Sequence, residues 1–482
     1  MNKKSVTRSR LQKPRGDLQK CGHCFQQRAA RRRTHWCFTL LAAFILSGAL
    51  CTHARAGLHN GPEYAALQAF YGSTHGANWT TSTNWNSGDA CAWFGIVCDQ
   101  DATPADNTSH VVSIDLPQNN LTGPLPALTD WPSLGIFHVT SNHLTGAIPA
   151  LTGLANLTLF YVNGNQLTGS LPSLTGLTHL VGFDADSNQL TGSIPALTGL
   201  TSLATFAVHF NQLSGSIPDL TGLTSLNFFA VSHNQLTGPI PALTGLTNLD
   251  TVDVNTNQLT GSIPALTGLT NMTEFDADYN QLTGSLPALT GLTKLGIFTA
   301  NFNGLTGSIP PLTGLTNLFY FSAFSNQLTG SVPALTGLTN LTFFYVNNNQ
   351  LTGTIPALTG LTNLGYFAVH SNQLTGTIPA LTGLTNLNYF GVYSNQLTGS
   401  IPALTGLNNL TYFYVHSNRL TGAVPKAPSA LQVAGLCPNP LNTTAQSMID
   451  PAWNAATGYS PWFATPYANN KCDDIFTADL GG

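Results

Sequence analysis

The stretch N-Q-L-T-G at residues 165–169 decides the fold, because it opens a segment that returns every 23 residues without insertion or deletion. Its leucine stands at Leu121, Leu144 and Leu167 and continues in register to Leu420, which gives fourteen copies. A fixed period of roughly 20–29 residues is typical of a solenoid, in which each unit buries its apolar face only against its neighbours. We therefore expect one stacked repeat fold whose specificity lies in the positions that differ between copies.

One copy of the repeat, residues 157–179, predicts which side chains face inward. Phe160 and Val162 are apolar at alternate positions, which is the period of a strand with one buried face. By the same alternation, Leu159 and Tyr161 point outward. The outward positions vary freely among the copies, whereas the inward positions hardly change. The outward side of these strands is therefore the expected binding surface.

Each copy also carries an asparagine just after the strand. An asparagine side chain has donors and an acceptor, so it can bond backbone groups of its own turn and of the adjacent coil. The predicted result is a ladder of side-chain hydrogen bonds that runs through the stack. The predicted ladder includes Asn165, Asn188, Asn211, Asn234, Asn257 and Asn280.

The unit follows the pattern L-x-x-L-x-L-x-x-N-x-L, with Phe often in the second position, and so resembles the leucine-rich repeat family. The form N-x-L-T-G-x-I-P at residues 257–264 resembles the plant-type class, although the copies here are one residue shorter than is usual there. Before the array, C-A-W-F-G-I-V-C at residues 91–98 resembles the N-terminal cap of that class. The resemblance spans about Glu63 to Pro425.

This resemblance implies an α/β-type repeat solenoid. Its expected shape is a curved horseshoe, with a parallel β-sheet on the concave side, short 3-10 or β segments on the convex side, and disulfide-closed caps. Caps are needed because the terminal units would otherwise expose apolar faces. We expect a targeting segment at residues 1–56, an N-terminal cap at 57–108, repeats at 109–425 and a C-terminal cap at 426–482.

Four cysteines outside the targeting segment form two pairs that flank the repeats. An even number of cysteines near the ends of an exported chain favours local disulfides. The predicted bridges join Cys91 to Cys98 and Cys437 to Cys472.

The first 56 residues combine a basic stretch, an apolar run at residues 36–51 and A-R-A at residues 54–56. This order is typical of a secretory signal, with Gly57 as the predicted mature N-terminus. A membrane anchor is the alternative, but the apolar run is short for a bilayer span. We predict a secreted, extracellular protein without a stable membrane span after cleavage, with the periplasm or the cell surface as alternative locations.

Charge is divided unevenly along the chain. Twelve of the sixteen Lys and Arg residues lie at or before Arg55, together with one of the twenty acidic residues. The remainder has four basic and nineteen acidic groups, so its net charge is −15 while that of the whole chain is −4. Nucleic-acid binding depends on Lys and Arg contacts to phosphates, so we predict no nucleic-acid partner.

Aromatic side chains gather on the predicted outward face of the later copies. A tyrosine offers a rigid apolar ring with a polar tip, and an apolar area of this size favours a contact site. Mutual stacking of cross-strand rings is the alternative; it would involve Phe324 as well. The predicted ligand-binding aromatics are Tyr320, Phe343, Tyr345, Tyr366, Tyr389, Tyr393, Tyr412 and Tyr414.

Acidic residues gather on the same face in two earlier copies. Asp250 and Asp253 lie in one copy, and Glu274, Asp276 and Asp278 lie in the next. They could bind calcium or attract a basic partner, with a solvated acidic strip as the alternative. We assign all of them except Asp250 to the ligand-binding face and predict no metal site.

The histidines are separated by whole copies and are predicted to be isolated surface residues. Asp184 and Asp186 lie several copies before the acidic group, too far away to share an ion with it.

No phosphate-binding loop, nucleophile elbow, zinc-protease motif or kinase motif occurs, so we predict neither enzyme activity nor a cofactor. The leading interpretation is a secreted recognition protein that binds a protein or polysaccharide ligand on its concave face. One alternative is a cell-surface structural or adhesive repeat protein. Another is an ice-binding protein that uses columns of threonine, such as the one through Thr152 and Thr175.

Overall fold

The computed structural model describes residues 57–99, 109–442, 451–460 and 462–463. All of these residues belong to one structural unit, Ala56–Gly482. The predicted targeting segment and Cys472 lie outside the described residues.

The N-terminal cap is a short α/β unit next to the first coil. Helix α2 (Pro62–Ser73) begins with a proline, whose missing N–H would have no intrahelical partner at this position. Two 3-10 turns, η1 (Gly76–Asn78) and η2 (Ala90–Ala92), lead to strand β1 (Ile96–Cys98). β1 pairs antiparallel with β2 (Val111–Asp115), so the cap supplies the first strand of the long sheet.

Aromatic rings join the cap to the repeats. Phe70 of α2 packs edge to face against Trp79 within the cap and against Trp131 beyond it, with ring centroids 5.9 and 6.3 Å apart. The predicted disulfide between Cys91 and Cys98 is present and confirmed. The cap therefore covers the apolar end of the stack.

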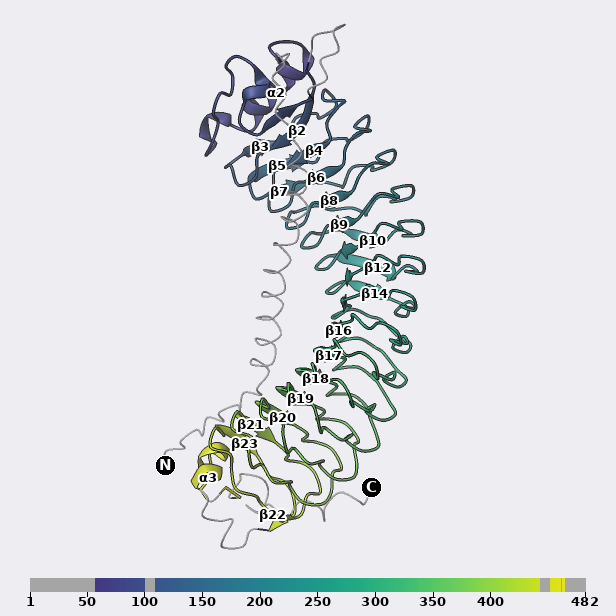
Figure 1. Cartoon of the computed structure of the whole chain (residues 1–482), viewed down its shortest axis with the longest axis vertical. Helices are drawn as coiled ribbons and strands as arrows, with labels where there is room; N and C mark the ends of the chain where they lie inside the picture. Colours follow the sequence, from purple (N-terminus) through teal and green to yellow (C-terminus); the bar gives the residue numbers. More distant parts are fainter. Residues whose placement is uncertain (1–56, 100–108, 443–450, 461, 464–482) are drawn as a thin grey trace, which may run out of the picture. The chain divides into compact units, whose positions relative to one another are not determined.

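A single long sheet runs through the stack, with one strand from each coil (Figure 1). From β2 to β21 neighbouring strands are parallel, and paired residues lie 23 positions apart, as Phe321 and Phe344 do. Figure 1 shows the coils of this unit stacked along a curved path with the sheet on the concave side, which confirms the predicted solenoid class. After β2 the strands are β4 (Ile136–His138), β6 (Leu159–Tyr161), β8 (Gly182–Asp184), β9 (Thr205–Ala207), β11 (Phe228–Ala230), β13 (Thr251–Asp253), β15 (Glu274–Asp276), β16 (Ile297–Thr299), β17 (Tyr320–Ser322), β18 (Phe343–Tyr345), β19 (Tyr366–Ala368), β20 (Tyr389–Gly391), β21 (Tyr412–Tyr414) and β23 (Val433–Gly435).

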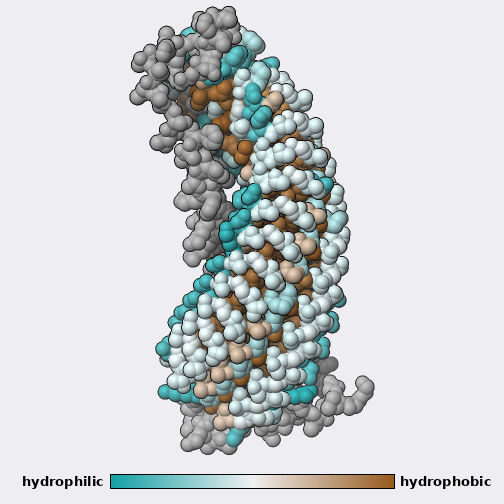
Figure 2. All heavy atoms as spheres, turned by 45° about the vertical axis from the view of Figure 1, so that its right-hand side comes forward, coloured by the Kyte–Doolittle hydropathy of each residue, from teal (hydrophilic) through white to brown (hydrophobic). Residues whose placement is uncertain are grey.

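The convex side consists of turns and short strands. Within the described residues the 3-10 turns η1 and η2 both belong to the cap, so of the two expected kinds of convex segment, 3-10 or β, the β kind is the one found outside the cap. Figure 2 shows part of this side, where pale residues of intermediate hydropathy form rows and brown apolar residues lie between them. The short strands are β3 (Thr122–Pro124), β5 (His143–Ala147) and β7 (Gln166–Thr168), then β10 (Ser214–Ser216), β12 (Gln235–Pro239) and β14 (Gln258–Thr260), and finally β22 (Gly422–Ala423) with β24 (Leu441–Asn442).

A column of stacked phenylalanine rings fills the interior behind the long sheet. Each of these residues is the inward-facing centre of its strand, and adjacent rings lie 5.5–5.9 Å apart and nearly parallel. Val252 interrupts the column between Phe229 and Phe275. Trp453 of helix α3 (Pro451–Thr457) packs against Phe413 at the C-terminal end, with centroids 6.0 Å apart.

The asparagine ladder is present as a continuous set of hydrogen bonds. Asn165 shows the pattern: its Nδ2 donates to the carbonyls of Val162 at 2.9 Å and Val139 at 3.1 Å, and its Oδ1 accepts from the Leu144 amide at 3.0 Å. Each ladder residue thus bonds its own turn and the preceding coil. Gly169, which follows in the repeat, has a φ of 77°, a conformation that favours glycine.

The repeat extends beyond its predicted end at Pro425. β23 pairs in parallel with β21, and Asn439 joins the ladder by accepting from the Leu420 amide at 3.0 Å. This last coil has 21 residues instead of 23, so the regular period does not reveal it. Cys437 is disulfide-bonded, whereas its predicted partner Cys472 lies outside the described residues.

Candidate functional site

The outward positions of the long sheet form a surface that we call the strand face. Each coil contributes one residue to each of three outward columns; in the coil of β17 these residues are Tyr320, Ser322 and, just after the strand, Phe324. Because adjacent strands pair in register, equivalent residues of successive copies lie side by side. The strand face carries all the predicted ligand-binding residues, but it separates them into an aromatic part and a polar part.

The aromatic part occupies β17 to β21, and we call it the aromatic platform. Its first column has successive ring contacts, with centroid distances of 5.3, 5.0, 6.4 and 6.3 Å. Tyr345 and Tyr414 of the second column approach Tyr320 and Tyr389 at 5.9 and 5.7 Å. The platform comprises Tyr320, Phe343, Tyr345, Tyr366, Tyr389, Tyr412 and Tyr414. The rings thus contact one another, as the stacking interpretation expects, and still share one face.

A stack of His370, Tyr393 and His416 lies beside the platform in the third column. The Tyr393 ring lies between the two imidazoles, with centroids 4.1 Å from His370 and 4.5 Å from His416. The prediction of isolated histidines is therefore wrong here, because an intervening tyrosine bridges histidines that are two copies apart. Burial, and then the nearby Tyr414 phenol, raises the pKa of Tyr393 to about 12, so this phenol stays neutral.

Burial also disfavours the protonated form of both imidazoles. It lowers the pKa of His370 to about 3, with His416 adding to the effect, and it lowers the pKa of His416 to about 4. Below pH 6.5, which is the ordinary pKa of histidine, these side chains bind protons in the unfolded state but not in the folded state. The free energy of unfolding is therefore highest above pH 6.5, and it decreases as the pH falls from 6.5 toward about 4.

We expect a double variant with His370→Asn and His416→Asn to lose less stability in acid than the wild type. Asparagine already stands in this column at Asn301 and Asn347, so the change suits the fold. Between pH 7 and pH 5 the wild type should lose about 3–4 kcal/mol more than the variant, since each pH unit below 6.5 is worth up to about 1.4 kcal/mol for each of the two histidines. Urea denaturation at both pH values measures the difference.

The exposed His143 provides the control for this experiment. His143→Asn should leave the pH dependence as it is in the wild type. Equal acid losses in the wild type and the double variant would contradict the burial effect.

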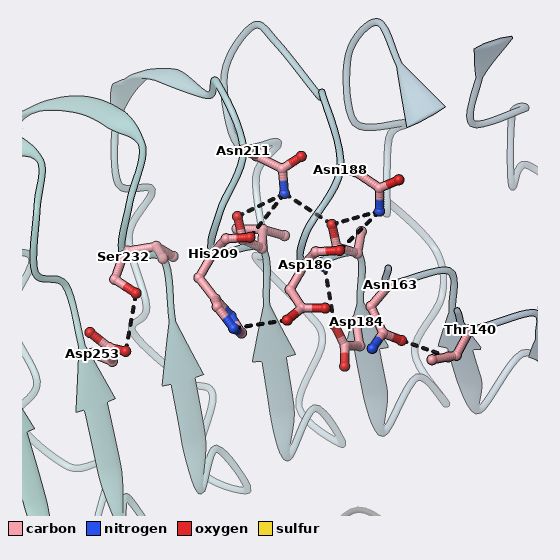
Figure 3. Close-up of polar contacts among 12 residues, drawn as sticks. Thr140, Asn163, Asp184, Asp186, Asn188, His209, Asn211, Ser232 and Asp253 are labelled. Carbon is pink, nitrogen blue, oxygen red and sulfur yellow. Dashed lines mark hydrogen bonds and ion pairs between the residues drawn. The ribbon is translucent and has the colours of Figure 1, made fainter. Parts of the chain in front are cut away.

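The polar part of the strand face begins with a contact between carboxylates and a histidine (Figure 3). His209 Nε2 lies 2.8 Å from Asp186 Oδ2, and the Asp186 amide donates to Asp184 Oδ1 at 3.1 Å. Burial and then the charge of Asp186 raise the pKa of Asp184 well above its usual value. Burial opposes a charged His209, but the hydrogen bond and charge of Asp186 outweigh it and raise the pKa of this histidine. The sequence did not predict this pairing, which joins adjacent copies.

The predicted acidic group is part of a hydrogen-bonded network and is not a solvated strip. Asn255 Nδ2 donates to Asp253 at 2.7 Å and to Asp276 at 2.9 Å, and the Thr299 hydroxyl donates to Asp276 at 2.6 Å. Asp253, Asp276 and Asp278 are buried, whereas Asp250 and Glu274 are half-buried. Amides and hydroxyls of adjacent copies therefore compensate for the burial of these carboxylates.

Asp278 occupies the third column of the same region. Its carboxylate accepts from the Asn301 amide at 2.6 Å and from Asn301 Nδ2 at 2.9 Å. Burial and then the charge of Asp276 raise the pKa of Asp278 well above its usual value. Among the described residues there is no group of three or more His, Cys, Asp or Glu side chains that could hold a metal ion. The buried carboxylates of this region are therefore hydrogen-bonded to groups of the protein itself.

The threonines of the framework contact the preceding coil. Thr191 and Thr398 donate to the carbonyls of Gly169 and Gly376 at 3.3 Å, and other threonines of this column do the same. These side chains stabilise coil-to-coil packing on the convex side. The other threonine columns remain exposed.

Comparison with known proteins agrees with this architecture. Residues 60–99 match the family model described as the leucine rich repeat N-terminal domain. The fold is therefore a parallel-strand solenoid of the leucine-rich-repeat type, and residues 60–99 are similar to the leucine rich repeat N-terminal domain. No curated protein sequence matches the chain. Within the described ranges, no helix has the length and apolar character needed to cross a bilayer.

Three similar solved structures are receptors. A TDR receptor is 28% identical, with a TM-score of 0.58, over 71% of this chain and 66% of that one. The leucine-rich-repeat ectodomain of the receptor kinase GASSHO1/SCHENGEN3 from Arabidopsis thaliana, in complex with CASPARIAN STRIP INTEGRITY FACTOR 2, is 26% identical, with a TM-score of 0.58, over 82% and 54%. The plant peptide hormone receptor RGFR1, in complex with RGF2, is 27% identical, with a TM-score of 0.56, over 73% and 68%. The chain therefore spans 66% and 54% of the first two structures.

Proposed function

We propose that this protein is a secreted, non-enzymatic recognition protein that binds an extended peptide segment of a partner across its aromatic platform. The observation that carries this proposal is the run of aromatic rings on one face of five adjacent strands, β17 to β21. Two of the similar structures are receptors complexed with the ligands named above, which supports a peptide over a polysaccharide.

The dimensions of the platform suit an extended peptide. Five parallel strands at about 4.8 Å spacing span about 19 Å, which an extended chain of about six residues can cover. Tyrosine rings supply apolar contact area at low entropic cost, while their hydroxyls bond peptide groups. The ligand would contact Tyr412, which is 36% exposed, and the half-buried Tyr320, Tyr366 and Tyr414. Phe343, Tyr345 and Tyr389 are only 7–8% exposed and would support those rings.

The test uses a library of displayed twelve-residue peptides selected on the purified wild-type chain. We expect enriched peptides to lose at least tenfold in affinity for a variant with Tyr366→Ala, Tyr389→Ala and Tyr412→Ala. Two ring contacts, at Tyr366 and Tyr412, of about 0.5–1.5 kcal/mol each suffice for such a loss, and Tyr389→Ala removes the buried ring that supports both of them. Isothermal titration with one synthesised peptide measures the affinity, and circular dichroism checks that the variant remains folded.

A matched control removes three exposed aromatics outside the platform: Phe94→Ala, Phe210→Ala and Tyr279→Ala. This control should bind the selected peptide within about twofold of the wild type. Equal binding by a folded platform variant, or enrichment only of cello- or chito-oligosaccharides in a parallel glycan screen, would refute the peptide proposal.

A further inference from the structure

Accessible and buried rings alternate along the first column of the aromatic platform. Tyr320 and Tyr366 are half-buried and Tyr412 is exposed, whereas Phe343 and Tyr389, which lie between them, are buried. The three accessible rings therefore belong to β17, β19 and β21, which are alternate strands of the sheet. At a strand spacing of about 4.8 Å, the strands that carry them lie about 9.6 Å apart along the stack.

The two buried rings pack on the second column. A Cβ atom added at Gly391 would lie 2.8 Å from both Cε1 and the hydroxyl oxygen of Tyr389, so the Tyr389 ring leans over this glycine. There it also contacts the Tyr414 ring, with centroids 5.7 Å apart. Phe343 contacts the ring of Tyr345 in its own strand, at 6.2 Å. Because these two rings lean on the second column, the rings of alternate copies remain accessible.

The spacing of the accessible rings distinguishes between two extended conformations of a peptide. In a β-strand, the side chains of one face recur at every second residue, about 6.6 Å apart. In a polyproline II helix they recur at every third residue, about 9.3 Å apart. Only the polyproline II repeat matches the distance of about 9.6 Å between alternate strands. The first, fourth and seventh side chains of such a segment would each meet an accessible ring.

Proline is the residue that best suits these three positions. Its ring fixes φ at about −65°, which is the value of the polyproline II helix, so little conformational entropy is lost on binding. Aromatic-lined surfaces recognise polyproline II segments for this reason. A polyproline II helix has no internal backbone hydrogen bonds, so its carbonyls can accept from phenol hydroxyls such as that of Tyr412.

We propose that the segment bound by the aromatic platform is a polyproline II helix with proline at every third position, P-x-x-P-x-x-P. This inference rests on the proposed function, because it names the kind of peptide that the same surface binds. Each proline packs on one of the rings of Tyr320, Tyr366 and Tyr412. Six steps of about 3.1 Å give this segment a length of about 19 Å, which is the span of the five strands.

The test compares two capped peptides of equal composition, P-A-A-P-A-A-P and P-A-P-A-P-A-A, by isothermal titration into the purified full-length chain. Both favour the polyproline II helix, but only the first places its three prolines on one face, since the helix has three residues per turn. We expect the first peptide to bind the wild type at least fivefold more tightly than the second. Equal affinities would overturn the proposal.

Two variants test the role of the alternating rings, and circular dichroism checks that each is folded. Tyr366→Ala removes the central accessible ring and should reduce the preference for P-A-A-P-A-A-P to less than twofold. Gly391→Ala removes no ring, but its Cβ displaces the Tyr389 ring toward the accessible ones, so it should reduce the preference to the same extent. Alanine is compatible with the fold here, because Ala368 is the paired residue of the preceding copy. A full preference in either folded variant would refute the proposal.

Gly365→Ala is the matched control for Gly391→Ala. A Cβ atom at Gly365 would meet no atom closer than 3.7 Å, so this variant should keep the wild-type preference. The peptides selected from the displayed library separate this inference from the proposed function. If those peptides bind through the platform while P-A-A-P-A-A-P has no advantage, only the polyproline II inference fails. If neither the selected peptides nor P-A-A-P-A-A-P binds through the platform, both proposals fail.

Discussion

Phe321→Ala is expected to destabilise the solenoid by about 3–5 kcal/mol, the cost of removing a fully buried phenylalanine side chain. The Phe321 ring lies between those of Phe298 and Phe344, with centroids 5.6 Å away on both sides. In a solenoid each coil contacts only its neighbours, so one defect weakens the interfaces on both of its sides. We therefore expect unfolding in urea, followed by circular dichroism, to separate into two transitions.

One other copy of the repeat carries a smaller residue at the position equivalent to Phe321. Val252 occupies the equivalent position in another copy, where it is buried between Phe229 and Phe275. Phe321→Val should therefore cost less, about 2 kcal/mol, because the valine leaves a smaller cavity. The exposed Phe210 is the second control, and Phe210→Ser should change stability by less than about 1 kcal/mol. A Phe321→Ala variant as stable as the wild type would show that ring stacking does not connect the coils.

Asn188→Ala is expected to cost about 2–4 kcal/mol, because it leaves several buried backbone groups without a partner. Asn188 Oδ1 accepts from the Leu167 amide at 2.9 Å, and its Nδ2 donates to the Val162 carbonyl at 3.1 Å and the Asp186 carbonyl at 3.0 Å. Figure 3 shows the bond between Asn188 and Asp186. Alanine replaces none of these bonds, and water has no access to the Leu167 amide between the coils. Thermal unfolding measures the loss of stability.

Hydrogen exchange locates the effect of Asn188→Ala in the structure. The Leu167 amide should exchange markedly faster in the variant, while amides several coils away keep their protection. Gln189→Ala is the matched control, since Gln189 is exposed and its backbone amide bonds Leu167 without help from the side chain. Destabilisation of equal size by Gln189→Ala would mean that the ladder contributes little of its own.

The framework of this protein was predictable because its residues act through local spacing. The alternation of Phe160 and Val162 with Leu159 and Tyr161 assigns inside and outside in every copy. The asparagine after the strand makes the same kinds of hydrogen bond to backbone groups in successive coils. The last coil was not predicted because it has 21 residues instead of 23. Its Ala434, Leu436 and Asn439 nevertheless have the same spacing as the two inward residues and the ladder asparagine of the other copies.

The site was less predictable because contacts on the strand face join different copies. Asn255 separates Asp253 and Asp276, and Tyr393 separates His370 and His416, so groups that look isolated in the sequence are joined by the residue between them. Burial in these contacts is what shifts their pKa values, and a period of 23 residues carries no information on burial of outward side chains.

By itself, the sequence determined the solenoid, its parallel sheet, its cap disulfide at Cys91 and Cys98, and the face on which the variable residues stand. It could do so because each of these depends on spacing within one repeat or between neighbouring repeats. Only the tertiary structure decided which outward side chains meet, that the carboxylates form a bonded network, and that Phe210 and Tyr279 stack on rings of the following copies. Those outcomes depend on how side chains from stacked coils pack across about 5 Å, which residue order alone does not specify.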